Sequence, residues 1–272
     1  MFYHVKAYVK YQTRTQKLKD IKSDFIRNFV STCFYDKSKY VEYEELKKYR
    51  KFLLNHKGTV DMVDFGAGSQ VFDSNIREIS KVARTSGISA KNAELLFRVV
   101  RHLQPSRILE IGTSLGLATS ALSMGNPKAQ LKTLEGCANT QSVPRGAFES
   151  DEFSFESERI HFVNTEFSSY LNTEEAIREP LDFIYFDGNH SKEATIAYFD
   201  ALLPTVNDNT VWIFDDIHWS KGMEESWEYI KAHPKVTSSI DAFQWGIVFF
   251  MPDLEGERCI IDPQPMMISR VM

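Results

Sequence analysis

Residues 108–116, Ile-Leu-Glu-Ile-Gly-Thr-Ser-Leu-Gly, join a short apolar run to a turn of small residues. Pro105 ends the helix that the apolar spacing before it predicts, so Ile108–Ile111 is predicted to be a buried strand. The small residues that follow let the backbone approach a ligand closely, and a helix is predicted from Leu117 to Met124. The stretch is therefore predicted to be the strand, turn and helix of an α/β unit.

The alternation of apolar runs and amphipathic stretches continues along the chain, and each further predicted strand ends in polar residues. These strands are Gln130–Leu134 before Glu135, Ile160–Val163 before Asn164-Thr165, Phe183–Phe186 before Asp187, and Val211–Phe214 before Asp215-Asp216. The pattern predicts a mostly parallel sheet with helices on both faces. Two β-rich runs, Val236–Phe243 and Trp245–Met251, predict a terminal antiparallel hairpin. Open α/β sheets bind ligands beyond the carboxyl ends of their strands, so the functional residues are expected there.

The composition is that of an ordinary globular protein. The chain has 272 residues, with 32 basic and 37 acidic side chains and a formal net charge of -5; 43% of the residues are hydrophobic and 25% are charged. These values exclude collagen-like, coiled-coil and disordered classes. The three cysteines lie far apart without ligand spacing, which predicts neither a disulfide framework nor a zinc site. With no signal-like or membrane-length apolar run, we expect a cytoplasmic protein without a membrane partner.

Charge is distributed unevenly. Residues 1–57 carry 14 basic and six acidic side chains, whereas residues 58–272 carry 18 and 31. The first segment is either a basic surface for an acidic substrate, nucleic acid or partner, or a solvated helical face that docks on the acidic remainder; the second interpretation is preferred. Residues 13–57 look helical and residues 58–88 irregular.

The glycine-rich turn and Glu135 together indicate a nucleoside pocket. Glu135 lies 25 positions beyond Glu110, at the end of the next predicted strand, where a carboxylate can accept both hydroxyl protons of a ribose. The dinucleotide pattern G-x-G-x-x-G fails, because Ser114 and Leu117 occupy its second and third glycine positions, and this disfavours NAD. The alternative is a tight turn that holds no ligand.

Four motifs at the strand ends carry a family resemblance. In order they are LEIGTSLG, TLEGC, YFDGNH and IFDDIHW, and they resemble class I S-adenosylmethionine-dependent methyltransferases, in particular the small-molecule O-methyltransferases similar to catechol O-methyltransferase and the macrolide-sugar enzymes. The resemblance covers residues 80–252. It implies a Rossmann-like, seven-stranded sheet with an antiparallel last strand. We therefore expect an S-adenosylmethionine-binding domain over residues 89–272, preceded by a mainly helical, basic cap or oligomerisation segment over residues 1–88.

The resemblance also implies which residues hold S-adenosylmethionine. The first loop would hold the methionine part of the cofactor and the acid after the second strand its ribose, while the residues after the third strand would lie near the adenine. Carried over to this chain, and with Asp187 added, the candidate cofactor-binding residues are Glu110, Gly112, Thr113, Ser114, Gly116, Glu135, Thr165, Glu166 and Asp187.

Three carboxylates suggest a metal site. Asp187, Asp215 and Asp216 follow neighbouring predicted strands and are the oxygen ligands that Mg²⁺ or Ca²⁺ prefers. In catechol-type enzymes the matching positions hold a magnesium ion that orients the substrate hydroxyls, although the third ligand there is Asn. Mg²⁺ is thus a candidate second cofactor. The alternative places only Asp187 in the site and gives the Asp pair a role in capping loops.

The candidate catalytic residues are His190, His218 and Asp187. The two imidazoles follow predicted strand ends, and their ordinary pKa suits a general base near neutrality. The alternative for each histidine is a hydrogen-bonded structural role. Trp219, Trp227 and Trp245 are expected to be core or rim aromatics rather than a substrate cage.

The function expected from these residues is S-adenosylmethionine-dependent methyl transfer to a hydroxyl of a small molecule. One alternative is methylation of nucleic acid, which is disfavoured because no DPPY-like tetrapeptide follows the fourth predicted strand. Another is a non-catalytic methyltransferase-like binding module. Residues 64–69, Asp-Phe-Gly-Ala-Gly-Ser, are interpreted as a turn, with part of a lid over the substrate as the alternative. A homodimer is left open.

Overall fold

The computed structural model describes residues 2–63, 74–254 and 256–263. The glycine motif at residues 64–69 lies outside these ranges. The chain divides into two compact units, one formed by residues 37–169 and the other by residues 1–36 together with residues 170–272. Each unit is an α/β assembly, and each is described by itself.

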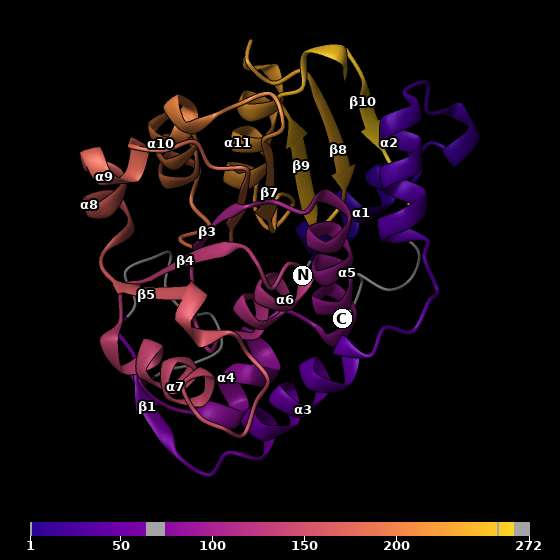
Figure 1. The fold of residues 1–272 in the computed structure, drawn as a ribbon. Helices are drawn as coiled ribbons and strands as arrows, with labels where there is room; N and C mark the ends of the chain where they lie inside the picture. Colours follow the sequence, from indigo (N-terminus) through magenta and orange to yellow (C-terminus); the bar gives the residue numbers. More distant parts are fainter. Residues whose placement is uncertain (1, 64–73, 255, 264–272) are drawn as a thin grey trace. The chain divides into compact units, whose positions relative to one another are not determined.

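The unit of residues 37–169 is built on three parallel strands. These are β3 (Arg107–Ile111), β4 (Gln130–Glu135) and β5 (Ile160–Asn164), with β4 in the middle. Ile111 pairs with Leu134, and Glu135 pairs with Asn164, so the carboxyl ends of the three strands lie at one edge (Figure 1). Residues Ile108–Ile111 of β3 are all buried, which fits a parallel strand covered on both faces. The three strands predicted from the sequence are confirmed.

Five helices and a small hairpin complete this unit. They are α3 (Glu42–Asn55), α4 (Ile79–Thr85), α5 (Ala90–Leu103), α6 (Leu117–Gly125) and α7 (Ala138–Phe148), with the antiparallel strands β1 (Thr59–Asp61) and β2 (Ile76–Glu78) and a 3-10 turn at Ser157–Arg159. The sequence predicted an irregular segment over residues 58–88. The structure has regular pairing there because Val60 and Arg77, which pair across the hairpin, are both buried.

Helix packing explains two sequence features of this unit. A Cβ added at Gly125 of α6 would lie 2.5 Å from Cβ of Val100, so only glycine lets α5 and α6 approach this closely. Helix α7 continues through Pro144 and ends at Phe148, followed by irregular chain up to Ser157. The sequence predicted a shortened, kinked or irregular segment here, and the irregular part begins only after the proline.

The described residues of the unit 1–36 and 170–272 form five strands. They are β6 (Phe183–Phe186), β7 (Val211–Asp215), β8 (Ser238–Ala242), β9 (Trp245–Phe249) and β10 (Arg258–Ile260), in the order β6-β7-β9-β8-β10. Strands β6 and β7 are parallel, and β9 is antiparallel to both β7 and β8, which confirms the predicted terminal hairpin. Strand β10 pairs with β8 in parallel and raises the number of strands above the expected seven.

The helices of this unit come from both ends of its sequence. They are α1 (Phe2–Gln12), α2 (Asp24–Phe29) with a following π turn (Val30–Phe34), α9 (Glu174–Ile177), α10 (Lys192–Leu202) and α11 (Lys221–Ala232), with 3-10 turns at Leu18–Asp20, Leu203–Thr205 and Pro252–Leu254. Helix α8 (Phe167–Leu171) lies where the chain passes between the units. Helix α1 is tied to the last strand region, because the Tyr11 hydroxyl donates to the carbonyl of Ile261 and Gln16 forms a bridge with the same residue.

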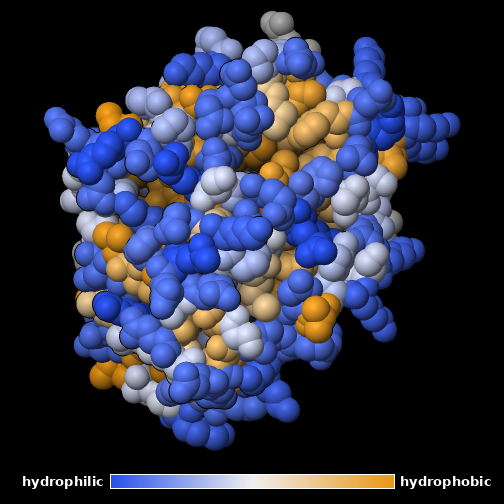
Figure 2. Space-filling view, viewed as in Figure 1, coloured by the Kyte–Doolittle hydropathy of each residue, from blue (hydrophilic) through white to orange (hydrophobic). Residues whose placement is uncertain are grey.

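The surface is mainly hydrophilic on the face shown in Figure 2, with hydrophobic residues in small groups between charged ones. Among the residues with assigned positions, the exposed large hydrophobic side chains include Val41 and Ile76. Within the same part of the chain, every helix falls short of the length and apolar character needed to span a bilayer.

Candidate functional site

The glycine-rich loop between β3 and α6 has an unusual backbone. Gly112, Ser114 and Gly116 have positive φ angles of 104°, 47° and 74°. Glycine adopts such angles without strain, whereas for Ser114 they are unfavourable and must be held by neighbouring contacts. The backbone N–H groups of Gly112 and Thr113 both donate to the carbonyl of Leu134 at 3.0 Å. The loop is thereby fixed to the end of β4.

Glu135 joins the loop to the next strand end. Its Oε2 accepts a hydrogen bond from the N–H of Ser114 at 2.9 Å, and its Oε1 accepts one from the N–H of Cys137 at 3.0 Å. Glu135, Gly112 and Ser114 are all partly exposed. A carboxylate offers about four lone-pair directions, so one that is oriented by two backbone donors can still accept the two hydroxyl protons of a ribose. The oriented carboxylate of Glu135 therefore fits the ribose in the nucleoside part of the expected cofactor.

Glu110 has a different setting. Its side chain is fully buried, and Oε2 accepts hydrogen bonds from the hydroxyls of Thr119 and Thr133, each at 2.6 Å. The Thr133 hydroxyl also lies 2.6 Å from that of Thr113 in the loop. A buried carboxylate held in this way orients the strand, loop and helix around it. A direct contact between Glu110 and a cofactor stays a prediction.

Gly116 faces the protein rather than solvent. A Cβ at this position would lie 2.6 Å from Cβ of Pro144 and 3.2 Å from the hydroxyl oxygen of Tyr49. Tyr49, on α3, donates a hydrogen bond of 2.7 Å to the carbonyl of Leu115. The last glycine of the motif is thus required by its backbone angle and by close packing against α7 and α3.

Cys137 is a site neighbour that the sequence analysis did not select. Its Sγ accepts the N–H of Val63 at 3.3 Å, and the N–H of Cys137 itself donates to Glu135. Burial raises the pKa of the thiol, but hydrogen bonds from Thr140 and nearby backbone groups outweigh it, and the net pKa is lowered. Its position in the sequence, two residues after Glu135, is the signal that could have placed it beside this acid.

Thr165 and Glu166 follow β5. The N–H of Thr165 donates to the carbonyl of Glu135 at 3.0 Å. Both carboxylate oxygens of Glu166 accept hydrogen bonds at the start of α8, from the N–H and hydroxyl groups of Ser168 and Ser169. Partial desolvation is outweighed by these bonds, which lower the pKa of Glu166 to about 2. The structure thus gives Glu166 a helix-capping role, and its expected proximity to adenine stays a prediction.

In the other unit, Asp187 and His190 form a pair after β6. Nε2 of His190 lies 3.4 Å from Oδ1 of Asp187. Burial alone would lower the pKa of His190, but the hydrogen bond to Asp187 and the charges of Asp216 and Asp215 raise it to about 9. Asn189, between the two members of the pair, has a positive φ of 54°. The pair is an imidazole with a carboxylate orienting one of its nitrogens, which is an arrangement suited to proton transfer.

The expected magnesium site is not supported. The part of the chain that the structure describes contains no group of three His, Cys, Asp or Glu side chains arranged to hold an ion. Asp215 is 1% exposed, Asp187 is paired with His190, and the charge of the imidazolium partly neutralises the carboxylates around it. The charges of all three carboxylates act on one histidine, His190.

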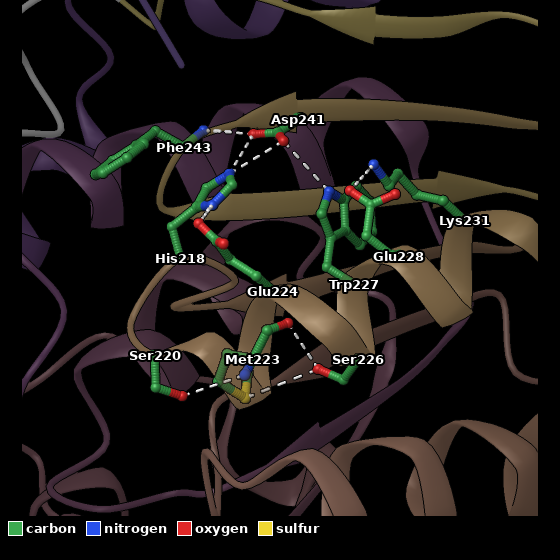
Figure 3. A network of polar contacts seen from close by, with 10 residues as sticks. All are labelled: His218, Ser220, Met223, Glu224, Ser226, Trp227, Glu228, Lys231, Asp241 and Phe243. Carbon is green, nitrogen blue, oxygen red and sulfur yellow. Dashed lines mark hydrogen bonds and ion pairs between the residues drawn. The ribbon is translucent and has the colours of Figure 1, made fainter. Parts of the chain in front are cut away.

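His218 lies between two carboxylates. Its Nδ1 is 2.9 Å from Oε1 of Glu224 on α11, and its Nε2 is 3.1 Å from Oδ2 of Asp241 on β8 (Figure 3). Burial lowers the pKa of the imidazole, but the two carboxylates outweigh burial and the net pKa is raised. With a carboxylate on each ring nitrogen, the imidazole is positioned as a cationic bridge between α11 and β8. This arrangement favours the structural alternative for His218.

Asp241 is the centre of this network. Besides His218, it accepts hydrogen bonds from the indole N–H of Trp227 at 3.3 Å and from the N–H of Phe243 at 3.0 Å (Figure 3). The ring of Phe243 stacks on His218 at 5.1 Å. Trp227 and Trp245 are buried, whereas Trp219 is 37% exposed. The tryptophans are therefore core and rim residues, as predicted.

Comparisons with known proteins give a domain match and a set of similar folds. Residues 109–217, which begin in β3 and end just after β7, match the family model of a methyltransferase domain. This segment contains the glycine-rich loop, Glu135, Asp187 and His190.

Solved structures resemble between 61% and 88% of this chain at low sequence identity. An O-methyltransferase from Bacillus cereus in complex with S-adenosylhomocysteine is 20% identical with a TM-score of 0.52, over 88% of this chain and 98% of that one. A methyltransferase from Podospora anserina with bound S-adenosylhomocysteine is 15% identical with a TM-score of 0.56, over 84% of this chain and 96% of that one. The Streptomyces achromogenes O-methyltransferase of tomaymycin synthesis, in complex with S-adenosylmethionine, is 18% identical with a TM-score of 0.50. This likeness covers 61% of this chain and 82% of that one. Residues 109–217 thus match a methyltransferase domain, and the chain has the fold of these methyltransferase structures.

Proposed function

We propose that this chain is an S-adenosylmethionine-dependent methyltransferase that methylates a hydroxyl group of a small molecule. The observation that carries the proposal is the carboxylate of Glu135, which two backbone N–H groups orient beside a partly exposed, glycine-rich loop. The methyltransferase family match and the O-methyltransferases among the structural neighbours support it.

The residues of the loop unit bind and orient the cofactor in this proposal. Glu135 accepts the ribose hydroxyls, and the backbone of Gly112 and Ser114 approaches the methionine part. Glu110 acts indirectly. Its buried carboxylate accepts hydrogen bonds from Thr119 and Thr133 and in this way fixes the loop conformation. When bound, S-adenosylmethionine supplies an electrophilic methyl group on a sulfonium, and positioning contributes most of the catalysis of such a transfer.

His190 is assigned the role of general base. The acceptor hydroxyl would give up its proton to this imidazole, while bound S-adenosylmethionine would supply the methyl group. Nε2 of His190 faces Asp187, so the proton is assigned to Nδ1. Asp187 orients the ring and stabilises the imidazolium that results. His218 is given no chemical role, since both of its nitrogens face carboxylates.

Two measurements test this proposal. Calorimetric titration of the full chain with S-adenosylhomocysteine is expected to give saturable binding in the range of tens of micromolar or tighter, with no binding of NAD. Labelled methyl transfer is then measured with a panel of catechols, sugar hydroxyls and lipid hydroxyls, with RNA and DNA oligonucleotides beside them. Absence of binding to the nucleoside would overturn the proposal, and labelling of an oligonucleotide alone would replace the substrate class.

A further inference from the structure

Helix α3 contacts the glycine-rich loop through Tyr49. The hydroxyl of Tyr49 donates a 2.7 Å hydrogen bond to the carbonyl of Leu115, which lies 66 residues further along the chain. Both residues are buried, with Tyr49 at 0% and Leu115 at 2% exposure. The bond therefore forms away from water, where the loss of the donor leaves the carbonyl without this partner.

The phenol is fixed by the aromatic rings around it. The rings of Phe148, Phe153 and Phe155 all meet the ring of Tyr49 edge to face, with centroids 5.2–5.5 Å away. Burial and the nearby charge of Glu110 raise the pKa of the phenol, so it keeps its proton and remains a donor. Tyr49 thus presents one O–H group in one direction from a rigid setting.

The loop at this point needs external support. Ser114 and Gly116, on either side of Leu115, both have positive φ angles, and for Ser114 that conformation is strained. The contacts from the β4 side fix Gly112, Thr113 and Ser114, at the start of the loop. The bond from Tyr49 fixes the end of the loop, immediately before α6 begins.

We propose that Tyr49 is a positioning residue for cofactor binding, which holds the glycine-rich loop in its binding conformation through the Leu115 carbonyl. The inference rests on the proposed function, because it takes S-adenosylmethionine as the ligand of the loop. Without the phenol, the free loop populates other conformations, and the apparent dissociation constant rises in inverse proportion to the population that can bind. Tyr49 belongs to residues 1–88, for which the sequence predicts a cap or oligomerisation segment.

The test compares two Tyr→Phe variants on the same helix. Tyr49→Phe removes the hydroxyl and keeps the aromatic ring in its cluster. Tyr43→Phe is the matched control, since Tyr43 is also buried on α3, and its hydroxyl accepts a 2.8 Å hydrogen bond from Arg98 rather than contacting the loop. Each variant loses one buried hydrogen bond, so the two are expected to lose similar stability in thermal unfolding.

The readouts are the dissociation constant of S-adenosylhomocysteine and hydrogen exchange in the unliganded protein. Tyr49→Phe is expected to weaken binding about tenfold and to speed amide exchange over residues 112–118, whereas Tyr43→Phe changes neither. Wild-type affinity and exchange in Tyr49→Phe would overturn the inference, and so would equal weakening in both variants. If the wild-type chain does not bind the nucleoside, the proposed function itself fails, and this outcome is distinct from a difference between variants.

Discussion

The carboxylate of Glu135 accepts a hydrogen bond from the N–H of Ser114, so the acid after β4 and the loop after β3 are held in one arrangement. In Glu135→Gln, one carboxylate oxygen is replaced by an NH₂ group, which is a donor. Either the N–H of Ser114 or that of Cys137 then loses its acceptor. We expect the affinity for S-adenosylhomocysteine to fall about tenfold to a hundredfold, as for loss of a charge-assisted hydrogen bond. Calorimetric titration measures this, with Glu158→Gln as the control because Glu158 is exposed. Equal affinities in the two variants would remove Glu135 from the binding site.

His190→Gln is expected to separate binding from turnover. The substitution removes the assigned base, so the rate of methyl transfer at about pH 9, where the neutral imidazole is well populated, should fall about a hundredfold. The dissociation constant of S-adenosylhomocysteine should stay within about twofold, because the loop residues that bind it are unchanged. His161→Gln, at an exposed imidazole, serves as the control. A rate equal to that of the wild type would assign deprotonation to another group.

His218→Gln is expected to affect stability more than catalysis. The change removes a cationic bridge between Glu224 and Asp241, and breaking a mostly buried ion pair costs about 3 kcal/mol. Denaturant unfolding measures the loss, and turnover measured well below the unfolding transition should remain within about threefold of the wild type. A hundredfold drop in turnover with unchanged stability would show that His218, and not His190, acts as the base.

Glu166→Gln tests the cap of α8 through pH. The folded-state pKa of Glu166 is lowered to about 2, so its carboxylate stabilises the fold above the ordinary pKa of a glutamate, and this contribution is lost as the pH falls toward 2. We expect the variant to be about 1 kcal/mol less stable at neutral pH, as for loss of a helix cap. The difference from wild type should shrink between about pH 5 and pH 2. A constant difference across this range would mean that the charge is not the stabilising feature.

The same Glu166 variant should bind S-adenosylhomocysteine within about twofold of the wild type, because both carboxylate oxygens already accept hydrogen bonds from Ser168 and Ser169. A large loss of affinity would instead place Glu166 against the cofactor.

Local patterns in the sequence predicted the strands and the loop well. Each of the strands β4 to β7 contains apolar residues and ends in, or is followed directly by, a polar residue, and the small residues directly after β3 predict a turn. These features could therefore be recognised within a few residues. The place of Glu135 beside the loop could be predicted because it follows the second predicted strand, 25 positions beyond Glu110.

Contacts between distant segments could not be predicted in this way. Tyr49 meets Leu115 across 66 residues, and the carboxylate that bridges to Nε2 of His218 lies 23 residues away on β8. The local sequence around a histidine that follows a strand does not show whether its nitrogens are exposed or both face carboxylates. The structural role of His218 could therefore not be told from its neighbours in sequence. The hairpin of β1 and β2 was missed for a similar reason, since its strands have only three residues each.

The division of the chain into two units has a consequence for biosynthesis. Residues 37–169 are continuous, so the glycine-rich loop, Glu135 and Tyr49 have all left the ribosome before β6 is made. The other unit cannot be completed until residue 261 is synthesised, because Tyr11 and Gln16 pair with Ile261. Domains generally fold as units during synthesis, so the segment that carries the loop is complete while α1 still waits for its partner.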